Sequence, residues 1–429
     1  MRMFWQWLEN FLHRWNGEWD PQKILIAVLA SGLALVLIRV LVAMLKWGWR
    51  HIRELIEARR RIKHALWAVS ENSPGLWLST PPNKGYPADY ISRMATSIPI
   101  MTVANLKGGV GKTTVAANLA AHYAYYGKRR DGTLGERVLF IDLDFQGSSS
   151  AMMLPENQRP DVAARLIEGG GKDILIHQAD PLRLEWRPNG IQPDARGIPA
   201  DYSLARADNR VMVRWLLKDY EGKGDARYWL ANALLDPEVQ AWYDRVIIDA
   251  PPRIVAGKVQ ALCASTHVLI PTILDRLCTE AASRFANQLH EEKELWPSLK
   301  IAGVTAVRCR TPQHIIAERE AIRGLIDALE RHPWRPQLFW NNAFIRQDTL
   351  LSQAAGQYSV YGTDSDNMAH ENVRAMFSNL AKAIEGGLKG TRTYEAWEAW
   401  LRNQNNHPAA GAARGNGFSE NDQAPLRPV

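Results

Sequence analysis

A glycine-rich loop over residues 105–114, Asn-Leu-Lys-Gly-Gly-Val-Gly-Lys-Thr-Thr, restricts the fold of this chain more than any other feature. It lies between a short β-branched apolar run, Ile100 to Ala104, and a helical pattern, Val115 to Tyr126, that stops at Gly127. Glycines let such a loop turn tightly, so its N–H groups and the positive end of the following helix face one point. The order of strand, loop and helix therefore predicts an α/β fold with a phosphate-binding loop.

The loop also predicts roles for individual residues. Lys112 supplies a charge for the β- and γ-phosphates of a nucleotide, and the hydroxyl of Thr113 is placed to ligate Mg²⁺. A tight turn without a ligand is the alternative, and the agreement of strand, Gly-Lys-Thr and helix argues against it. The nucleotide-binding residues that we expect are Lys107, Gly108, Gly109, Val110, Gly111, Lys112, Thr113 and Thr114.

A second lysine points to a particular class of phosphate-binding loop. The general pattern Gly-x4-Gly-Lys-Thr has a glycine where this chain has Leu106, and Lys107 opens the loop. The string Lys-Gly-Gly-Val-Gly-Lys-Thr-Thr resembles the deviant Walker A motif of the ParA/MinD family of P-loop ATPases. In that family the early lysine reaches the nucleotide of a partner subunit. The resemblance thus implies that Lys107 acts across a homodimer that closes around ATP.

A second motif ends the apolar run Val138 to Asp142, which has the pattern of a buried strand. Carboxylates at the end of such a strand lie at the edge where open α/β sheets bind ligands. The sequence Asp-Leu-Asp-Phe-Gln-Gly from Asp142 resembles the family's Asp-x-Asp-Pro-Gln-Gly segment, whose second aspartate positions the attacking water. The resemblance gives this role to Asp144, with Phe145 in place of the usual proline. Ordinary polar residues at a strand end are the alternative.

A third motif is the apolar run that closes on Asp249 and continues as Ala-Pro-Pro. It has the Walker B pattern, in which the carboxylate holds the coordination shell of Mg²⁺, and it resembles the family's switch II. Between the last two motifs, Gly197 to Ala207 is similar to the family's Ile-Pro-Ala segment. We therefore expect Thr113 and Asp249 as the metal residues, and the resemblance implies Lys107, Lys112 and Asp144 as the catalytic ones.

Apolar runs and helical patterns alternate along the rest of the chain. Two more buried strands are expected at His267 to Thr272 and Lys300 to Val307, with a helix at Thr279 to Glu294 between them. This alternation predicts a mostly parallel, Rossmann-like P-loop sheet flanked by helices, and the resemblance covers residues 98–388. Residues 161–189 are open to two interpretations, an insertion for a partner or a longer surface excursion, and the excursion is favoured.

The residues that would recognise the adenine base of the nucleotide are not assigned either. Arg308-Cys309-Arg310 stands where the family usually has an asparagine that reads adenine. Further along, Pro312 to His332 has the pattern of a solvated amphipathic helix, and Ala369 to Ile384 that of a closing helix.

The N-terminal part has the composition of a membrane anchor. Residues 24–45 are apolar apart from Arg39, and a helix of this length spans about 33 Å, close to the thickness of the bilayer hydrocarbon. Trp and Phe recur at helical spacing before it, so we expect an interfacial helix there, with a core helix as the alternative. A cleaved signal peptide fits less well, because Lys46 to Arg50 follows the apolar run without a small-residue cleavage site.

Charge predicts the orientation of this anchor. Residues 1–20 hold two basic and three acidic residues, and residues 46–63 hold seven basic and two acidic ones. The positive-inside rule then places the N-terminus outside and the rest of the chain in the cytosol. Residues 1–63 carry +6 of the total charge of +7, so the remainder is nearly neutral, which favours anionic lipid over nucleic acid. Three cysteines without metal-type spacing suit a reducing cytosol.

The expected parts are an aromatic interfacial segment (1–22), a transmembrane helix (23–46), a basic juxtamembrane helix (47–70), a linker (71–97), the ATPase domain (98–388) and a disordered tail (389–429). We expect an ATPase anchored in the inner (cytoplasmic) membrane that binds ATP and Mg²⁺ and forms an ATP-sandwich homodimer. It would act as a nucleotide-dependent switch or positioning protein on a protein partner that the sequence does not identify.

Two alternatives stay open. Membrane-anchored bacterial tyrosine kinases use a related P-loop, but they carry two membrane helices and a C-terminal tyrosine cluster, whereas this chain has one such helix and only Tyr394 in its tail. A DNA-partition ATPase shares the domain and should have a basic face on its dimer, which the nearly neutral charge after residue 63 does not favour.

Overall fold

The computed structural model describes residues 5–6, 9–10, 21–68, 77–78, 86–155, 161–187, 190, 192–217, 224–309, 318–339, 343–365, 367–386 and 399. The chain divides into two compact units, residues 1–64 and residues 65–429. The expected interfacial segment (1–22) and the expected tail (389–429) lie almost wholly outside the described residues.

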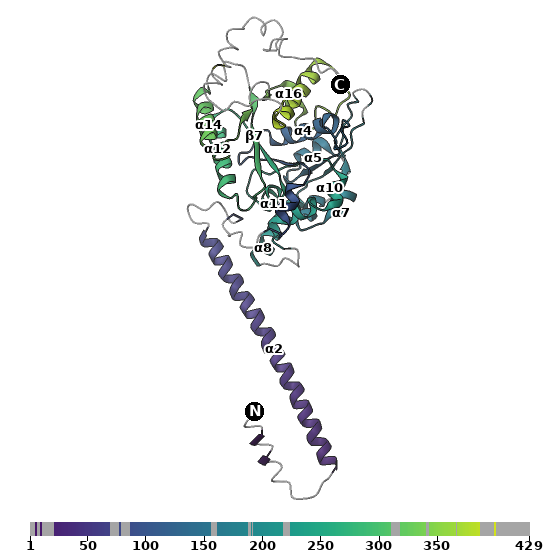
Figure 1. The fold of residues 1–429 in the computed structure, drawn as a ribbon, viewed down its shortest axis with the longest axis vertical. Coiled ribbons are helices and arrows are strands. Elements are labelled where there is room, and N and C mark those ends of the chain that lie inside the picture. Colours follow the sequence, from purple (N-terminus) through teal and green to yellow (C-terminus); the bar gives the residue numbers. More distant parts are fainter. Residues whose placement is uncertain are drawn as a thin grey trace. The chain divides into compact units, whose positions relative to one another are not determined.

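The described part of the first unit is dominated by one helix, α2 (Pro21–Ala68) (Figure 1). It is continuous from the expected transmembrane segment into the basic juxtamembrane segment, because no proline follows Pro21 to interrupt its backbone hydrogen bonds. Within the described residues it is the one helix long and apolar enough to cross a membrane, and the apolar side chains of that stretch, Val28 to Arg60, are not buried by protein.

The second unit is built on a single sheet with the strand order β3-β4-β2-β5-β1-β6-β7-β8, and β9 pairs with β7. Every described pairing is parallel except that of β3 with β4. The mostly parallel sheet predicted from the sequence is therefore confirmed. The strands are β1 (Ile100–Val103), β2 (Val138–Asp142), β3 (Asp180–Pro181), β4 (Ala195–Ile198), β5 (Arg245–Asp249), β6 (His267–Thr272), β7 (Lys300–Cys309), β8 (Leu338–Phe339) and β9 (Ile345–Arg346).

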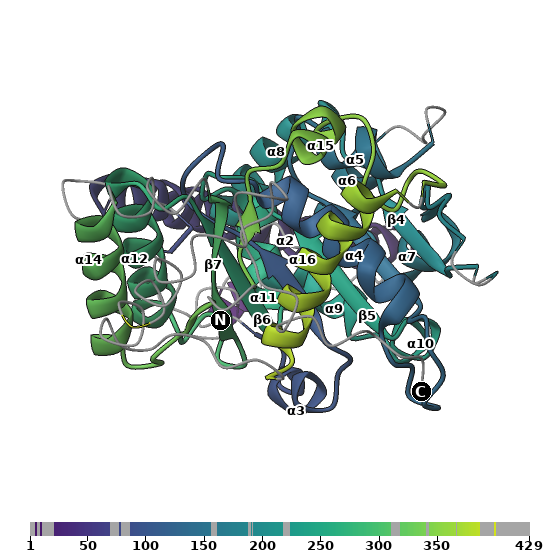
Figure 2. The same cartoon turned by 90° about the horizontal axis from the view of Figure 1, so that it is seen from above.

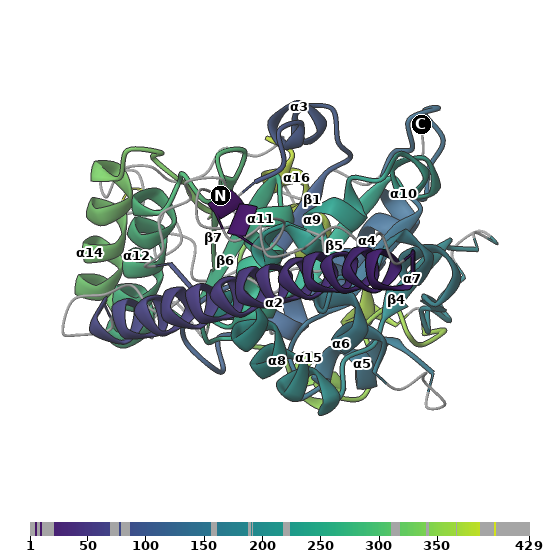
Figure 3. The ribbon, with the colours of Figure 1, turned by 90° about the horizontal axis from the view of Figure 1, so that it is seen from below.

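Helices cover both faces of this sheet. Successive side chains of a strand point to opposite sides, so a strand with apolar residues at every position needs cover on both. In β2, Leu139 and Ile141 enter one hydrophobic core, and Val138 and Phe140 enter the other. Helices α4 and α16 lie together over one face (Figure 2), and α11 and α9 lie over the other (Figure 3). The long helices of this unit are α4 (Lys112–Tyr126), α8 (Ser203–Leu217), α11 (Ala256–Ala264), α12 (Arg276–Glu291), α14 (Arg319–Arg331) and α16 (Met368–Ile384).

Shorter helices complete the two layers. They are α3 (Tyr90–Ala95), α5 (Ser148–Met153), α6 (Val162–Ile167), α7 (Lys172–His177), α9 (Trp229–Leu234), α10 (Pro237–Trp242) and α15 (Thr349–Ala354), with a 3₁₀ turn, η2, at Ala226–Tyr228.

Residues 161–189 differ from the expected surface excursion. Helix α6 buries Val162, Leu166 and Ile167 in the hydrophobic core, and α7 adds Leu175. The prediction of an excursion was wrong because each apolar run here is only one or two helical turns long, too short to show a helical period. This segment is therefore part of the layer that covers the sheet.

The expected linker over residues 71–97 also differs from the structure where it is described. Trp77 and Leu78 are buried, and the Trp77 ring lies 4.9 Å from that of Trp215 on α8. Helix α3 buries Tyr90 and Met94 in the same core. The Pro, Ser, Gly and Asn content suggested a linker, but the aromatic side chains in it gain more from burial than from exposure to water.

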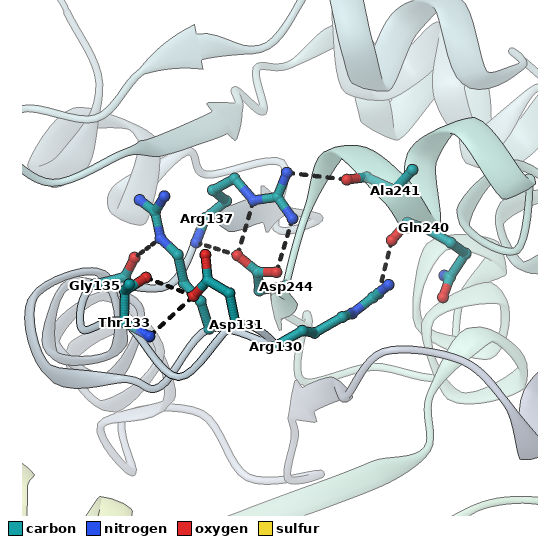
Figure 4. A network of polar contacts seen from close by, with 9 residues as sticks. Arg130, Asp131, Thr133, Gly135, Arg137, Gln240, Ala241 and Asp244 are labelled. Atoms are coloured by element: carbon teal, nitrogen blue, oxygen red, sulfur yellow. Dashed lines mark hydrogen bonds and ion pairs between the residues drawn. The ribbon is translucent and has the colours of Figure 1, made fainter.

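The loop between α4 and β2, residues 127–137, is fastened to α10 by polar contacts (Figure 4). Arg137 forms a bidentate ion pair with Asp244, with N–O distances of 2.8 and 2.9 Å. Arg130 donates to the carbonyl of Gln240 at 2.7 Å. Since Arg137 and Asp244 directly precede β2 and β5, these contacts tie together the amino ends of two central strands. Their carboxyl ends, at the opposite edge, carry the predicted site.

Candidate nucleotide-binding site

The three sequence motifs meet at the carboxyl edge of the sheet. Strand β5 pairs with β1 on one side and with β2 on the other, and its last residue, Asp249, lies opposite Val103 and Asp142. Because β1 runs into the glycine-rich loop and β2 runs into Asp144, the strand register alone brings the predicted residues of all three motifs together. The topology therefore places the residues of the three motifs at one edge of the sheet.

The glycine-rich loop has the backbone that only glycine adopts easily. Gly109 and Gly111 have φ angles of +74° and +78°. A Cβ at position 111 would also lie 2.8 Å from Cγ1 of Val307 on β7, whereas Cβ atoms at Gly108 and Gly109 would meet nothing within 4 Å. The loop is thus packed behind Gly111 and open around Gly108 and Gly109.

Helix α4 begins directly after this loop. Gly111 is its N-cap residue, and since glycine has no side chain, the N-cap position leaves the N–H groups of the first turn uncapped. Uncapped N–H groups and the helix dipole attract an anion. The start of α4 therefore has the properties of a phosphate-binding helix end.

The two lysines of the loop are placed differently. Lys112 is buried, and its Nζ donates to the carbonyl of Lys107 at 3.0 Å. Burial lowers the pKa of Lys112, and the carboxylates of Asp249 and Asp144 oppose this change. The side chain of Lys107 is exposed, while its backbone N–H donates to Oδ1 of Asn105 at 3.1 Å. Lys112 thus lies inside the site with the two aspartates, and Lys107 does not.

Apart from the glycines, the other predicted residues of the loop are at least partly buried. Val110 is fully buried, and Thr113 and Thr114 are half-buried in the first turn of α4.

Asp142 and Asp249 are both buried at the strand ends but have unequal surroundings. Asp142 accepts hydrogen bonds from the N–H groups of Asp144 and Ser150, at 3.0 and 2.9 Å, and from the Ser150 hydroxyl at 2.6 Å. Neither carboxylate oxygen of Asp249 has a hydrogen-bond partner among the described residues. Asp142 is therefore a structural group that holds the start of its loop, and Asp249 is free to accept a ligand.

Burial raises the pKa of Asp249 to about 8, and the charge of Asp142 adds to this increase. The nearby hydroxyls of Thr113 and Ser149 and the charge of Lys112 lower the pKa in part. Without a bound metal ion, this carboxyl group therefore holds its proton more tightly than an ordinary aspartic acid does.

Asp144 lies half-buried at the next turn. Its Oδ1 accepts the N–H of Gln146 at 3.2 Å, and the following Phe145 is exposed and packs edge to face on Tyr202, with ring centroids 6.4 Å apart. The Ser150 hydroxyl accepts the N–H of Ala200 at 2.9 Å, which joins this loop to the Ile-Pro-Ala segment. The aromatic contact and this hydrogen bond orient a loop that lacks the usual proline.

A cavity of about 520 Å³ adjoins the glycine-rich loop at Gly111 and Thr114. Its far wall is formed by the end of β7, β9 and the start of α15, including Arg308, Arg346 and Asp348. Arg308 has a φ of +56°, an uncommon conformation for a residue with a side chain. From the sequence, only the unusual Arg-Cys-Arg at residues 308–310 could be noted here, because the cavity walls come from segments far apart in the chain.

Comparisons with known proteins agree with this geometry. A family model described as an AAA domain matches residues 98–301. The chain is 32% identical to the sporulation initiation inhibitor protein Soj of Bacillus subtilis over 206 residues, which are 48% of this chain and 70% of that protein. It is 31% identical to the chromosome-partitioning ATPase Soj of Thermus thermophilus over 255 residues, 59% of this chain and 83% of that protein.

A solved structure supports the fold. Apo McdA from Cyanothece aligns over 67% of this chain and 99% of its own length, with a TM-score of 0.50 and 19% sequence identity. The Soj matches cover more than two thirds of each relative, and the family model spans all three motifs of the site. On these grounds the chain belongs to the ParA/MinD family of P-loop ATPases.

Proposed function

We propose that this protein is a membrane-anchored ATPase that binds ATP with Mg²⁺, closes as an ATP-sandwich homodimer and acts as a nucleotide-dependent switch or positioning protein. The observation that carries the proposal is the carboxylate of Asp249, buried beside Lys112 with no hydrogen-bond partner among the described residues. A buried carboxylate without partners is costly, and a bound cation would remove this cost.

The donors around Asp249 suit Mg²⁺. A carboxylate and the half-buried hydroxyl of Thr113 are hard oxygen ligands, which this ion prefers, and the ion takes its remaining ligands from phosphates and water. No group of three or more His, Cys, Asp or Glu residues that could hold a metal occurs in the described part of the chain, so a site shared with phosphate is the better fit. Mg²⁺ would supply neutralisation of the phosphate charge.

Each predicted residue then has a role in this proposal. The N–H groups of residues 108–114 bind phosphate oxygens, and Lys112 gives up its contact with the Lys107 carbonyl to contact the β- and γ-phosphates. Asp144 orients the attacking water from the half-buried loop after β2. Lys107, whose side chain is exposed, reaches the nucleotide of the partner subunit.

The cavity beside the loop would take the nucleoside. Gly111 and Thr114 belong both to the cavity wall and to the phosphate-binding loop, so a nucleotide bound at the loop extends into the cavity. Arg308 and Arg346 can stack on a base, and Asp348 can accept hydrogen bonds from a base or a ribose.

Helix α2 would hold the protein in the inner membrane, with the N-terminus outside and the ATPase unit in the cytosol. Its apolar stretch is unburied, and basic residues follow it on the proposed cytosolic side. A permanent anchor argues against cycling on and off the bilayer. The nucleotide state would instead gate a protein partner. One relative, the Soj protein of Thermus thermophilus, is named a chromosome-partitioning ATPase.

Membrane vesicles of both orientations test the enzyme and its topology together. ATP does not cross a bilayer, so we expect hydrolysis by inside-out vesicles that carry the full-length chain and none by right-side-out vesicles, with Lys112→Ala vesicles as the background. Hydrolysis above this background by right-side-out vesicles would show the opposite orientation. Equal rates for Lys112→Ala and the natural chain in both kinds of vesicle would show that the protein is not an ATPase.

The raised pKa of Asp249 predicts how Mg²⁺ binding depends on pH. The group must lose its proton to bind the ion, and it ionises as the pH rises through about 8. The gain in nucleotide affinity that Mg²⁺ causes should therefore increase about tenfold from pH 7 to pH 9. We would measure binding of a fluorescent nucleotide with Mg²⁺ and with EDTA at each pH, so that effects on Lys112 cancel in the ratio. The same ratio for Asp249→Asn should not change with pH, and an equal change in both proteins would contradict the assignment.

A further inference from the structure

A buried lysine outside the three motifs contacts two loops of the site. Lys258, on α11, has no exposed surface, and its Nζ donates to the carbonyl of Asn105 at 3.1 Å and to that of Pro252 at 3.3 Å. Its amine also lies 4.6 Å from the ring centroid of Phe285. No carboxylate of the described residues pairs with it. A lysine is rarely buried in this way, because its amine loses hydration that two carbonyls replace only in part.

The two carbonyls belong to different parts of the nucleotide site. Asn105 is the residue at which the chain leaves β1 for the glycine-rich loop, and Pro252 lies in the loop that follows Asp249. Lys258 therefore bridges the two segments that would surround Mg²⁺ and phosphate.

The bridge continues from Asn105 to Lys107. The Asn105 side chain donates to the carbonyl of Pro271 at 2.7 Å and accepts the N–H of Lys107 at 3.1 Å. A line of hydrogen bonds thus runs from Pro252 through the Lys258 amine and Asn105 to the backbone of Lys107. These contacts give a shift of the loop after Asp249 a route to the backbone of Lys107.

We propose that Lys258 is a positioning residue, which holds the entrance of the phosphate-binding loop at a fixed spacing from the loop after Asp249 and thereby orients Lys107. This inference rests on the proposed ATPase function for its kinetic consequences, but the spacing itself is a property of the protein without nucleotide. A chain whose loops are set in advance loses less on closing around the transition state.

The electrostatics agree with a bridging rather than an ion-pairing role. Burial lowers the pKa of Lys258 well below its ordinary value, and the charge of Lys112 lowers it further. A neutral amine has two N–H groups, which match the two carbonyls. Removing the amine takes this donor from the buried carbonyl of Asn105 and from the part-buried carbonyl of Pro252, so the loops must separate or admit water.

Two variants and a control separate positioning from simple support of the core. Lys258→Met keeps a long side chain but has no hydrogen-bond donor. Lys258→Gln has a side chain as long as that of methionine and carries two amide N–H groups. Gln260→Met is the matched control, because Gln260 is buried on the same helix and donates to a backbone carbonyl, that of Ile167 at 2.8 Å, on helix α6. All proteins are full-length chains in detergent micelles.

The rate of amide hydrogen exchange in the nucleotide-free proteins measures directly whether Lys258 holds the two loops. In Lys258→Met we expect amides of residues 104–107 and 250–259 to exchange at least about tenfold faster than in the natural chain, both segments together. Gln260→Met should leave residues 104–107 unchanged, and Lys258→Gln should lie between the natural chain and Lys258→Met. Faster exchange of residues 250–259 alone, or equal changes at residues 104–107 in Lys258→Met and Gln260→Met, would overturn the proposal.

Steady-state ATP hydrolysis gives the second readout. Lys258→Met should lower kcat about tenfold or more with less than a threefold change in KM, because Lys258 touches the loops and not the nucleotide. Gln260→Met should retain kcat even if its Tm falls by a similar amount. If Lys258→Met does not fold, Lys258→Gln provides the test. A kcat of Lys258→Gln within twofold of that of the natural chain, together with an unchanged exchange rate at residues 104–107, would contradict the proposal. If the natural chain itself hydrolyses no ATP, the proposed function fails, while the exchange result still tests the bridge.

Discussion

Asp144→Ala is expected to bind ATP and Mg²⁺ and to form closed dimers, but to hydrolyse ATP about 10²-fold more slowly or worse. The glycine-rich loop, Lys112 and Asp249 are untouched by this change, so the parts that bind phosphate and metal remain. Asp144 lies half-buried beside them, with one carboxylate oxygen bonded to the N–H of Gln146. In the mechanism proposed above, its loss removes the group that orients the attacking water. Single-turnover hydrolysis by the full-length chain in micelles measures the effect.

Asp201→Ala is a matched control for this variant. Asp201 is an exposed carboxylate in the neighbouring Ile-Pro-Ala segment, where it accepts the N–H of Ser203 at 3.0 Å. This control should hydrolyse ATP at close to the natural rate. Asp249→Ala should instead bind Mg²⁺ and nucleotide weakly and stay monomeric. Turnover of Asp144→Ala near that of the natural chain would remove Asp144 from the mechanism.

Lys112→Ala is expected to lose nucleotide binding, whereas Lys107→Ala should bind ATP nearly as the natural chain does and fail to dimerise. Lys112 is buried inside the loop with its amine near two carboxylates, so its removal takes the only loop cation inside the site. The Lys107 side chain is exposed and free to reach a partner. We expect an affinity loss of about 10²-fold or more for Lys112→Ala, the scale of a desolvated charge contact with phosphate.

Fluorescent-nucleotide binding and ATP-dependent cross-linking of the full-length chain measure these two effects separately. Lys128→Ala serves as the control for loss of an exposed lysine, since Lys128 lies at the far end of α4 from the glycine-rich loop. Equal loss of nucleotide binding in Lys107→Ala and Lys112→Ala would show that the two lysines do not have separate roles.

The parts of the site that could be predicted from the sequence are those whose residues are neighbours in the chain. The glycines around Lys112 indicate a phosphate-binding loop, because only glycine adopts the φ angles found at positions 109 and 111 without strain. Asp249 could be placed because it ends an apolar strand, and parallel strands present their carboxyl ends at one edge.

The remainder depends on contacts between distant residues, which leave no local pattern. Strand β4 consists of Ala-Arg-Gly-Ile, which has little strand character, and it exists because all four residues pair with β2. Trp77 and Tyr90 were assigned to a linker from the composition around them, although both are buried against other parts of the chain. Lys258 carries no signal at all in the sequence, since its role depends on where the carbonyls of Asn105 and Pro252 lie.

The burial of Trp77 has a consequence for how two copies of this protein could meet. Only eight residues lie between the end of α2 at Ala68 and Trp77, so the stretch that joins α2 to the buried Trp77 spans at most about 30 Å. With α2 in the membrane, each ATPase unit searches a small disc around its own anchor and meets others only by lateral diffusion. The surface density of anchors, rather than the amount of protein per cell volume, would then set how often pairs form. Crowding the anchors into one patch of membrane would favour pairing at an unchanged ATP concentration.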